Sequence, residues 1–281
     1  VYGFSIEENT SKSIFKNADL LKNIATERVI SEFLKLICGK DAVKILDAYR
    51  ETIAVIIPEI TVMFNFNQNN IHHSYDLWQH TLTALGTIEP NSILRMTMLL
   101  HDIGKPSVKT TDNSGQSHFQ GHQLESKKIA DRILHRLRLP SDFINKTLLL
   151  IEYHDVRFNG SKKLMKKVMN VLGTDLTKQL LEVEYADISA QSEYQREEKL
   201  GYLETAKTHF NEIIKDNECF KLSQLDINGK DVLNLGVKEG RDVGNILDYL
   251  LMLVVDANVP NKKSILISKA KEYIYGNQIN K

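Results

Sequence analysis

The residue pair with the clearest chemical potential in this sequence is His101 followed directly by Asp102, within the segment LLHDIGK. The apolar residues before the pair predict a helix over 91–103, which Gly104 and Pro106 end. At a helix C-terminus, an imidazole and a carboxylate lie where backbone carbonyls also point. This mixed ligand set suits Mn²⁺, Fe²⁺, Ni²⁺, Co²⁺ or Zn²⁺, and Mg²⁺ is a less natural occupant.

Further ligand-type side chains lie before and after this pair. His80 precedes His101 by 21 residues, His122 and His154 follow it, and Asp187 lies further along the chain. Ordinary structural alternatives exist for these residues. His80 could be a core histidine bonded to a backbone carbonyl, and Asp187 could be a solvent-facing acid on a helix.

This set of histidines and acids, with the His–Asp pair at its centre, resembles the HD-domain family of metal-dependent phosphohydrolases. The resemblance implies four ligands for one divalent metal ion: His80, His101, Asp102 and Asp187. It also implies that His122 and His154 bind a second ion, which Asp102 bridges to the first. The ordinary alternatives for all six donors would have to coincide with the family's positions by chance. We therefore expect one or two divalent ions per chain.

The expected reaction needs these ligands for a physical reason. A divalent ion lowers the pKa of a bound water molecule toward neutrality, and a second ion stabilises the charge of a phosphate. Lys105 resembles the lysine that family members direct at a substrate phosphate, so Asp102 and Lys105 are the expected catalytic residues. The resemblance implies phosphomonoesters or 2',3'-cyclic phosphodiesters at RNA or nucleotide ends as substrates.

Apolar residues at helical spacing predict the elements that must position these side chains. In the middle of the chain we expect helices at 75–87, 91–103, 122–138, 141–154, 161–172, 174–190 and 193–216. Segment KTTDNSGQSHFQG, after the second of them, is predicted to be an exposed loop. Before this part, a helix is expected over 18–38 and a polar loop over 65–70, and after it helices near 230–236, 241–257 and 262–275.

The composition favours an all-α protein. Its 281 residues include only 14 glycines and 5 prolines, which leaves few turn residues for a many-stranded fold. With 42% hydrophobic and 26% charged residues, the composition excludes the disordered and fibrous classes. Cys38 and Cys219 form neither a disulfide framework nor a paired-cysteine zinc motif. No membrane-spanning stretch or signal sequence is found, so we expect a cytoplasmic protein without a membrane partner.

The charge is zero overall but unevenly distributed. Residues 127–167 hold eleven basic and four acidic residues, a net charge of +7, whereas 182–218 hold ten acidic and four basic residues, a net charge of −6. Such asymmetry favours a surface that faces a polyanion, and the alternative is two faces that partly neutralise each other. Two basic rows at helical spacing are candidate RNA-binding residues: Lys128, Arg132 and Arg136, and Lys162, Lys163, Lys166 and Lys167. For any one of these lysines, a solvated helix face is the stronger alternative.

The resemblance extends beyond the candidate metal ligands. Residues 3–39 resemble the neck of bacterial CCA-adding enzymes (tRNA nucleotidyltransferases) and their poly(A) polymerase relatives, and LSQLDINGKDVLNLGVKEGRDVGNILDYLLMLVVDANVPN resembles their tail. This resemblance implies an all-α protein with a helical neck over 1–70, a multi-helix HD-domain body over 71–218 and a helical tail over 219–281. It also implies tRNA, or another RNA 3' end, and nucleotides as partners.

Nucleotide addition itself is not expected from this chain alone. The catalytic head of that family carries paired carboxylates in an Asp-x-Asp pattern, which this sequence lacks. The nearest pair, Glu182 and Glu184, lies on a predicted helix without the preceding Gly-Ser turn, and the chain begins with Val1, as a fragment could. The expected function is therefore HD-type phosphohydrolysis. The alternatives are a tRNA-binding module for a missing head, or a nucleotide or alarmone hydrolase, and a homo-oligomer remains open.

Overall fold

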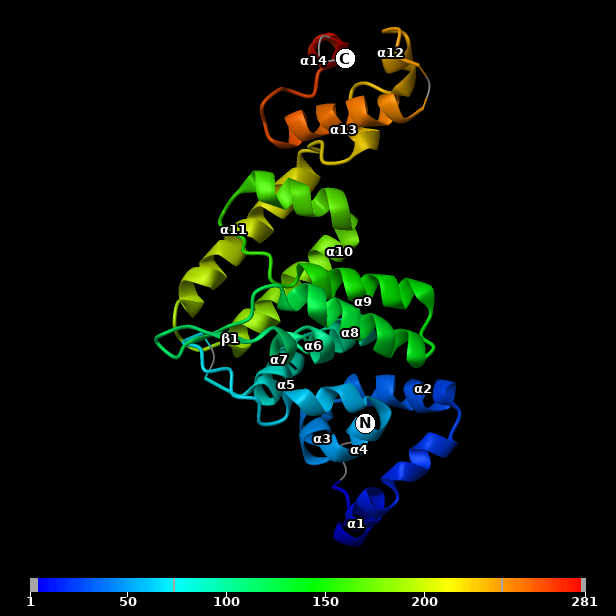
Figure 1. The fold of residues 1–281 in the computed structure, drawn as a ribbon, viewed down its shortest axis with the longest axis vertical. Coiled ribbons are helices and arrows are strands. Elements are labelled where there is room, and N and C mark those ends of the chain that lie inside the picture. Colours follow the sequence, from blue (N-terminus) through cyan, green and yellow to red (C-terminus); the bar gives the residue numbers. More distant parts are fainter. Residues whose placement is uncertain (1–4, 73, 239, 279–281) are drawn as a thin grey trace. The chain divides into compact units, whose positions relative to one another are not determined.

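The structure is a computed structural model that describes residues 5–72, 74–238 and 240–278, and nearly all of its regular structure is helical (Figure 1). This confirms the predicted all-α class. The chain divides into two compact units. Unit 1 contains Val1–Arg157 and Lys178–Gly201, and unit 2 contains Phe158–Thr177 and Tyr202–Lys281. The three-part division into neck, body and tail stays a prediction.

Short helices form the first part of unit 1. They are α1 (Glu8–Lys16), the 3-10 helix η1 (Ala18–Asn23), α2 (Thr26–Ile37), α3 (Ala42–Ala48), α4 (Arg50–Ile56) and the 3-10 helix η2 (Pro58–Met63). The single helix predicted over 18–38 is wrong at its start, because Ile24 and Ala25 have extended ψ angles of 143° and 130°. The predicted apolar stripe lies wholly within α2, where Ile30, Phe33 and Ile37 are buried.

Five helices of unit 1 surround the candidate site. They are α5 (Leu77–Thr87), α6 (Ser92–Leu100), α7 (Lys105–Val108), α8 (His122–Arg136) and α9 (Ser141–Tyr153). The Asp76 carboxylate caps α5 by accepting from the backbone of Gln79, and Asn91 caps α6 in the same way. Helix α9 packs against α6 and α8, and α5 packs against α6 (Figure 1). Trp78 and Leu99, both fully buried, belong to the core of this unit.

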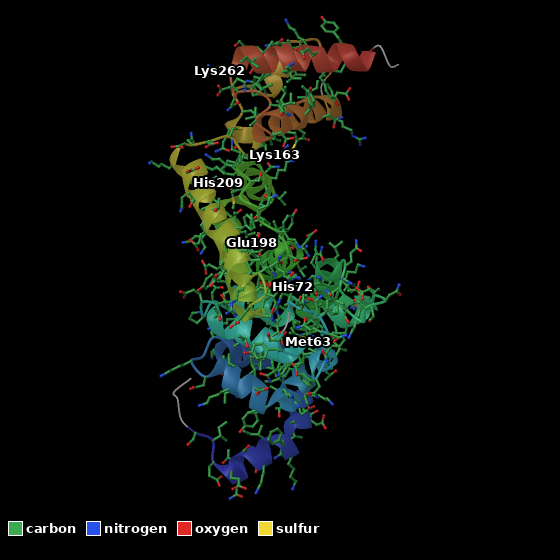
Figure 2. The ribbon with its side chains drawn as sticks, turned by 90° about the vertical axis from the view of Figure 1, so that its left-hand side faces the viewer. Met63, His72, Lys163, Glu198, His209 and Lys262 are labelled. Carbon is green, nitrogen blue, oxygen red and sulfur yellow. The ribbon has the colours of Figure 1, made fainter. Side chains whose placement is uncertain are left out.

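A short β hairpin interrupts the segment predicted as an exposed loop. Its strands, β1 (Thr110–Thr111) and β2 (Ser117–His118), pair antiparallel. The polar segment 65–70 is hydrogen-bonded to this hairpin: the amides of Asn69 and Asn70 donate to backbone carbonyls of residues 115 and 117. Figure 2 labels Met63 at the end of η2 and His72 just beyond this segment. The end of this segment is therefore held by amide side chains, which helical periodicity does not detect.

Two long helices each contribute residues to both units. They are α10 (Lys162–Ala190), whose backbone is non-helical at Gly173 with a φ of +70°, and α11 (Arg196–Lys215). Gly173 separates the two helices that the sequence predicts on either side of it, because only glycine adopts this conformation at low cost.

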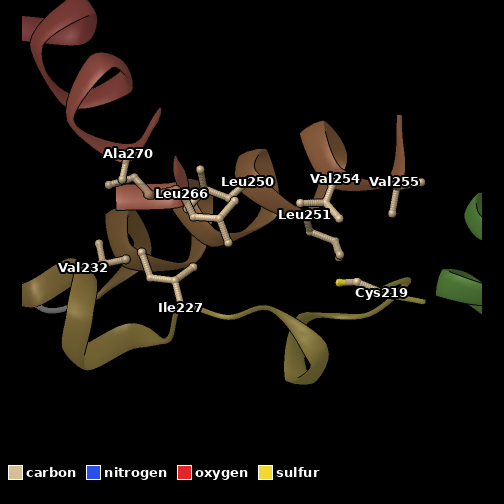
Figure 3. Packing of buried hydrophobic residues seen from close by; sticks show 10 residues of the cluster. Cys219, Ile227, Val232, Leu250, Leu251, Val254, Val255, Leu266 and Ala270 are labelled. Carbon is tan, nitrogen blue, oxygen red and sulfur yellow. The ribbon is translucent and has the colours of Figure 1, made fainter. Parts of the chain in front are cut away.

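The rest of unit 2 consists of helices that pack around their own core. They are the 3-10 helix η3 (Leu222–Gln224), α12 (Gly229–Leu233), α13 (Arg241–Val255) and α14 (Lys263–Gln278). Val232, Leu250 and Leu266 meet in this core and are fully buried (Figure 3). These three α-helices match the predicted tail helices to within a few residues. Among the described helices, none combines the length and the apolar character that a bilayer crossing requires.

Candidate metal centre

All six side chains that the sequence singles out as metal ligands converge within unit 1. They come from five segments: His80 from α5, His101 and Asp102 from the turn after α6, His122 from the first residue of α8, His154 from the residue after α9, and Asp187 from the last turn of α10. His80, His101, Asp102 and His154 are almost fully buried, and His122 is 8% exposed. The side chain of Asp187 is 13% exposed. It is therefore not a solvent-facing acid.

The first group of ligand atoms contains two imidazoles and two carboxylates. His80 Nε2 lies 2.9 Å from Asp187 Oδ1 and 3.4 Å from Asp102 Oδ2. His101 Nε2 lies 3.2 Å from the same Asp102 oxygen and 3.5 Å from the same Asp187 oxygen. All four ligand atoms lie within 4.8 Å of one another, so they could hold a single ion.

A second group shares Asp102 with the first. The other carboxylate oxygen, Asp102 Oδ1, lies 3.2 Å from His122 Nε2 and 3.5 Å from His154 Nε2. The two imidazole Nε2 atoms are 3.2 Å apart. Because each oxygen of Asp102 faces a different pair of histidines, this carboxylate has the orientation required to bridge two ions.

Backbone carbonyls orient the four histidine rings. The Nδ1 atoms of His80, His101, His122 and His154 lie 3.3, 2.7, 2.9 and 2.7 Å from the carbonyl oxygens of residues 190, 98, 119 and 151. A carbonyl can only accept a hydrogen bond, so this network assigns the proton of each neutral ring to Nδ1. Each Nε2 therefore directs a lone pair at the centre, as it does in a metal-ligating histidine.

The inward atoms need positive charge between them. Lone pairs on Nε2 face carboxylate oxygens and, between His122 and His154, each other. Within the described residues, His101 Nε2 and Asp102 Oδ1 are buried and have no hydrogen bond of normal geometry. Buried acceptors that face one another are costly unless a proton or a cation lies between them. The residues present therefore fit a divalent cation.

The pKa values of these side chains also show that the centre favours positive charge. Burial disfavours charge on His101, but the charges of Asp102 and Asp187 outweigh burial and raise the pKa of the ring to about 10. Burial alone would raise the pKa of Asp102, but the charges of His101 and Lys105 lower it well below its usual value. Burial would likewise raise the pKa of Asp187, but His101 and His80 lower it well below its usual value, so both carboxylates are ionised. A proton on His101 supplies positive charge that a metal ion could replace.

Lys105 is buried beside Asp102. Its Nζ lies 2.6 Å from Asp102 Oδ2, donates to Gln68 Oε1 at 3.1 Å and lies 5.6 Å from the ring centroid of Phe119. Gln68 is 1% exposed and also donates to the carbonyl of Tyr75. Sequence reasoning missed Gln68 because it lies in a segment without helical or strand periodicity.

Gly104 allows the His–Asp turn to lie directly on α8. A Cβ atom at this position would be 2.5 Å from the backbone nitrogen of Ser126 and 2.8 Å from the carbonyl oxygen of His122. The backbone N–H of Gly104 also donates to the Ser126 hydroxyl at 2.9 Å. The sequence suggests that Gly104 ends a helix. The structure shows a second reason for glycine here, because the turn lies against α8, the helix that carries His122.

The basic residues predicted to bind RNA on α8 have mixed surroundings. Lys128 is exposed and pairs with Glu125, and Arg132 is exposed. Arg136 pairs with Glu59 at 2.6 Å and donates to the carbonyl of Ile56 at 3.0 Å. Arg136 thus links α8 to the segment around Glu59, whereas Lys128 and Arg132 are exposed on the surface. The RNA-binding role of this row stays a prediction.

The four lysines at the start of α10 are paired with acids of the same unit. Lys162 and Lys166 contact Glu218, Lys162 also contacts Glu212, and Lys163 and Lys167 both lie 3.1 Å from Asp256 Oδ1. This supports the alternative that the basic and acidic stretches partly neutralise each other. Their predicted contact with RNA would have to exchange these partners for phosphates.

Two family models match this chain. The model described as tRNA nucleotidyltransferase domain 2, putative, matches residues 122–270, which is more than half of the chain. The model described as probable RNA and SrmB-binding site of polymerase A matches residues 3–64.

Similar curated proteins carry related names. The CC-adding tRNA nucleotidyltransferase of Thermus thermophilus is 28% identical over 278 residues, covering 93% of this chain and 61% of the relative. The A-adding tRNA nucleotidyltransferase of Deinococcus radiodurans is 29% identical, covering 55% of this chain and 38% of the relative. The multifunctional CCA protein of Legionella pneumophila is 27% identical, with shares of 59% and 43%. The chain thus spans less than two thirds of the length of these relatives.

A solved structure has the same fold. The Bacillus stearothermophilus CCA-adding enzyme, crystallised in complex with CTP, matches with a TM-score of 0.65 and 18% identity. The match covers 100% of this chain and 60% of that protein.

Proposed function

The chain belongs to the tRNA nucleotidyltransferase family, and from this premise we propose that its six clustered histidines and aspartates form a divalent-metal centre that hydrolyses phosphoesters. The proposed substrates are phosphomonoesters and 2',3'-cyclic phosphodiesters at RNA or nucleotide ends. Such substrates fit the family, because a blocked RNA 3' end cannot accept a nucleotide.

One observation carries this proposal. Four buried imidazoles direct their Nε2 atoms at two ionised carboxylates, and the two oxygens of Asp102 divide between two groups of ligands. A purely structural cluster would instead pair each acceptor with a donor. The donor set, imidazole with carboxylate, favours Mn²⁺, Fe²⁺, Co²⁺, Ni²⁺ or Zn²⁺ over Mg²⁺.

The proposed roles of the side chains follow from their contacts. His80, His101, Asp102 and Asp187 would hold the first ion, and His122 and His154 would add a second on the other oxygen of Asp102. When bound, divalent ions acidify water and offset phosphate charge.

Lys105 adds a third source of positive charge. Its ammonium lies next to Asp102, where it can stabilise negative charge that develops on a phosphate. Gln68 holds this ammonium in place from the other side.

A phosphate-release assay tests the proposal. Purified protein supplied with Mn²⁺, Ni²⁺ or Mg²⁺ should hydrolyse a nucleoside 2',3'-cyclic phosphate or a nucleoside monophosphate. Asp102→Ala should abolish this activity, since Asp102 belongs to both groups. Asp175→Ala, which removes an exposed carboxylate from α10, serves as the matched control. Equal rates for wild type and Asp102→Ala would contradict the proposal, and a wider substrate screen would identify a nucleotide or alarmone hydrolase.

RNA binding is a second candidate function, favoured by the match of residues 3–64 to an RNA-binding family. It predicts that affinity for tRNA falls steeply as salt rises, because phosphate contacts release counterions. Replacing Lys162, Lys163, Lys166 and Lys167 by Gln should weaken binding, whereas Asp102→Ala should not. Fluorescence anisotropy with labelled tRNA measures both, and affinity that is insensitive to salt would contradict this candidate.

A further inference from the structure

A chain of hydrogen bonds links Asp187 to a lysine. Asp187 Oδ2 accepts from Gln191 Nε2 at 2.8 Å, and Gln191 Oε1 accepts from Lys199 Nζ at 2.6 Å. The Lys199 ammonium also lies 3.3 Å from Nδ1 of His72. Figure 2 labels His72 and Glu198, the residue that precedes Lys199 on α11. All of these residues belong to unit 1.

The chemistry of its two neighbours fixes the orientation of the Gln191 amide. Asp187 can only accept a hydrogen bond and Lys199 can only donate one, so the amide nitrogen must face Asp187 and the amide oxygen must face Lys199. Since Oδ2 of Asp187 is occupied in this way, Oδ1 is left to face His80 and His101. Gln191 is therefore a positioning residue for Asp187.

Lys199 carries charge that its own contacts do not neutralise. Among the described residues, no carboxylate oxygen lies within 4.0 Å of its Nζ, and both of its polar contacts are to neutral groups. Burial lowers the pKa of Lys199, and the charges of Arg157 and Lys105 lower it further, although the charges of Asp187 and Asp155 counteract them. A half-buried ammonium that contacts no carboxylate is stabilised when an anion reaches it.

Lys105 and Lys199 are each linked to one of the two carboxylates of the centre. Lys105 contacts Asp102 directly, and Lys199 reaches Asp187 through one amide. Each of the two carboxylates is thus linked to an ammonium, directly at Asp102 and through Gln191 at Asp187. A single lysine at Asp102 would leave the Asp187 side without one.

We propose that Lys199 is an anion-binding residue of this centre, which donates to a phosphate oxygen of the substrate while Gln191 keeps Asp187 in its ligand orientation. This inference rests on the proposed function and adds a residue to it. The structural alternative is that Lys199 merely fastens α11 to the turn after α10, where Arg196 also donates to the carbonyl of Gln191.

Phosphate binding separates these two roles. The full chain, loaded with Mn²⁺, is titrated with inorganic phosphate by isothermal titration calorimetry, and the Mn²⁺ content of each sample is measured by elemental analysis. Lys199→Gln should weaken phosphate binding about tenfold or more, because a hydrogen bond to a charged group is lost, while the Mn²⁺ content is retained. Lys199→Arg should restore most of the affinity. Lys146→Gln, which removes an exposed lysine paired with Asp142, should bind phosphate like wild type.

Each other outcome has a distinct meaning. Unchanged phosphate affinity in Lys199→Gln would overturn the inference and leave the proposed function intact. Loss of Mn²⁺ from Lys199→Gln would show that the lysine acts through Gln191 on the metal ligands, which would also overturn an anion-binding role. Wild-type protein that retains Mn²⁺ but neither binds phosphate nor hydrolyses phosphoesters would overturn the proposed function and this inference together.

Discussion

At the residue scale, the centre depends on which atom of each side chain faces inward. The Nδ1 atoms of all four rings bond to backbone carbonyls, so no histidine can turn without breaking a hydrogen bond. Gln191 does the same for one oxygen of Asp187. Ligands that are fixed before an ion arrives lose little conformational freedom when they bind it, which favours affinity.

Replacing Gln191 by Leu should weaken metal binding. The substitution leaves Asp187 Oδ2 without its donor and frees the carboxylate to rotate, and loss of such outer contacts typically costs about 10–100-fold in metal affinity. Competition with a fluorescent chelator measures the dissociation constant for Mn²⁺. Gln123→Leu, which alters a half-buried amide on α8, is the matched control. Unaltered affinity in Gln191→Leu would mean that the orientation of Asp187 does not depend on this hydrogen bond.

Metal affinity should rise with pH. In the ion-free protein the pKa of His101 is raised to about 10, so near neutrality its ring is protonated and an ion must displace that proton. Affinity should therefore increase roughly tenfold per pH unit between about pH 6.5 and about pH 8.5 for each proton released. Calorimetry in buffers of different ionisation enthalpy counts the protons. His135→Gln, at an exposed histidine of α8, should keep the same slope, and affinity independent of pH would contradict the proton exchange.

The residues of the site were predictable to different degrees. The sequence left His80 as either a metal ligand or a core histidine bonded to a backbone carbonyl. The structure shows both features, because Nδ1 reaches a backbone carbonyl while Nε2 faces the carboxylates. Gln68, Gln191 and Lys199 could not be predicted, since an amide or a lysine in a polar stretch has no spacing that marks it. Only the fold shows which of the many polar side chains become buried.

At the scale of elements, the centre is formed by the ends of helices rather than by their middles. The His–Asp turn follows α6, His122 begins α8, and His154 follows α9. These three ends meet because α9 packs against both α6 and α8. The predicted helices over 122–138 and 141–154 agree closely with α8 and α9, whereas α6 ends at Leu100, before the His–Asp pair. Periodicity identifies helices well but leaves their last turn uncertain, and here the candidate ligands lie at such helix ends.

Gly104→Ala should destabilise unit 1 and loosen the centre. The new Cβ would collide with the backbone of α8, which cannot give way as a flexible side chain can, at a cost of about 1–3 kcal/mol. Urea denaturation measures this change, and Mn²⁺ affinity should fall with it because His122 moves relative to Asp102. Gly201→Ala is the matched control: a Cβ there meets nothing within 4 Å, so stability should be unchanged or higher. Equal stability of the two variants would show that the turn does not need this close approach.

At the scale of the whole molecule, the chain forms two compact units, and the candidate metal ligands and the core of the tail helices lie in different units. All candidate metal ligands lie in unit 1, and the core around Leu250 lies in unit 2. The four lysines at the start of α10 have their acidic partners within unit 2: Glu212 and Glu218 from the acidic stretch, and Asp256. Charge counts along a chain cannot reveal such pairing, because they do not show which stretches fold against each other.

Leu250→Ala should destabilise unit 2 without emptying the metal centre. Leu250 is fully buried, so the cavity should cost about 2–5 kcal/mol. Thermal unfolding of the full chain measures the loss, and Met252→Ala, at a residue 40% exposed on the same helix, should cost far less. Mn²⁺ content should stay at the wild-type level in both variants. Loss of bound Mn²⁺ from folded Leu250→Ala would contradict the assignment of the centre to unit 1 alone.

The central claim, that these six side chains bind divalent metal ions, is tested most directly by elemental analysis of protein incubated with Mn²⁺ and then freed of unbound ions. We expect wild type to retain one or two ions per chain, one for each group of ligands. Asp102→Ala should retain none, because its carboxylate is common to both groups. Retention of Mn²⁺ by the variant at the wild-type level, or no retention by wild type, would contradict the account.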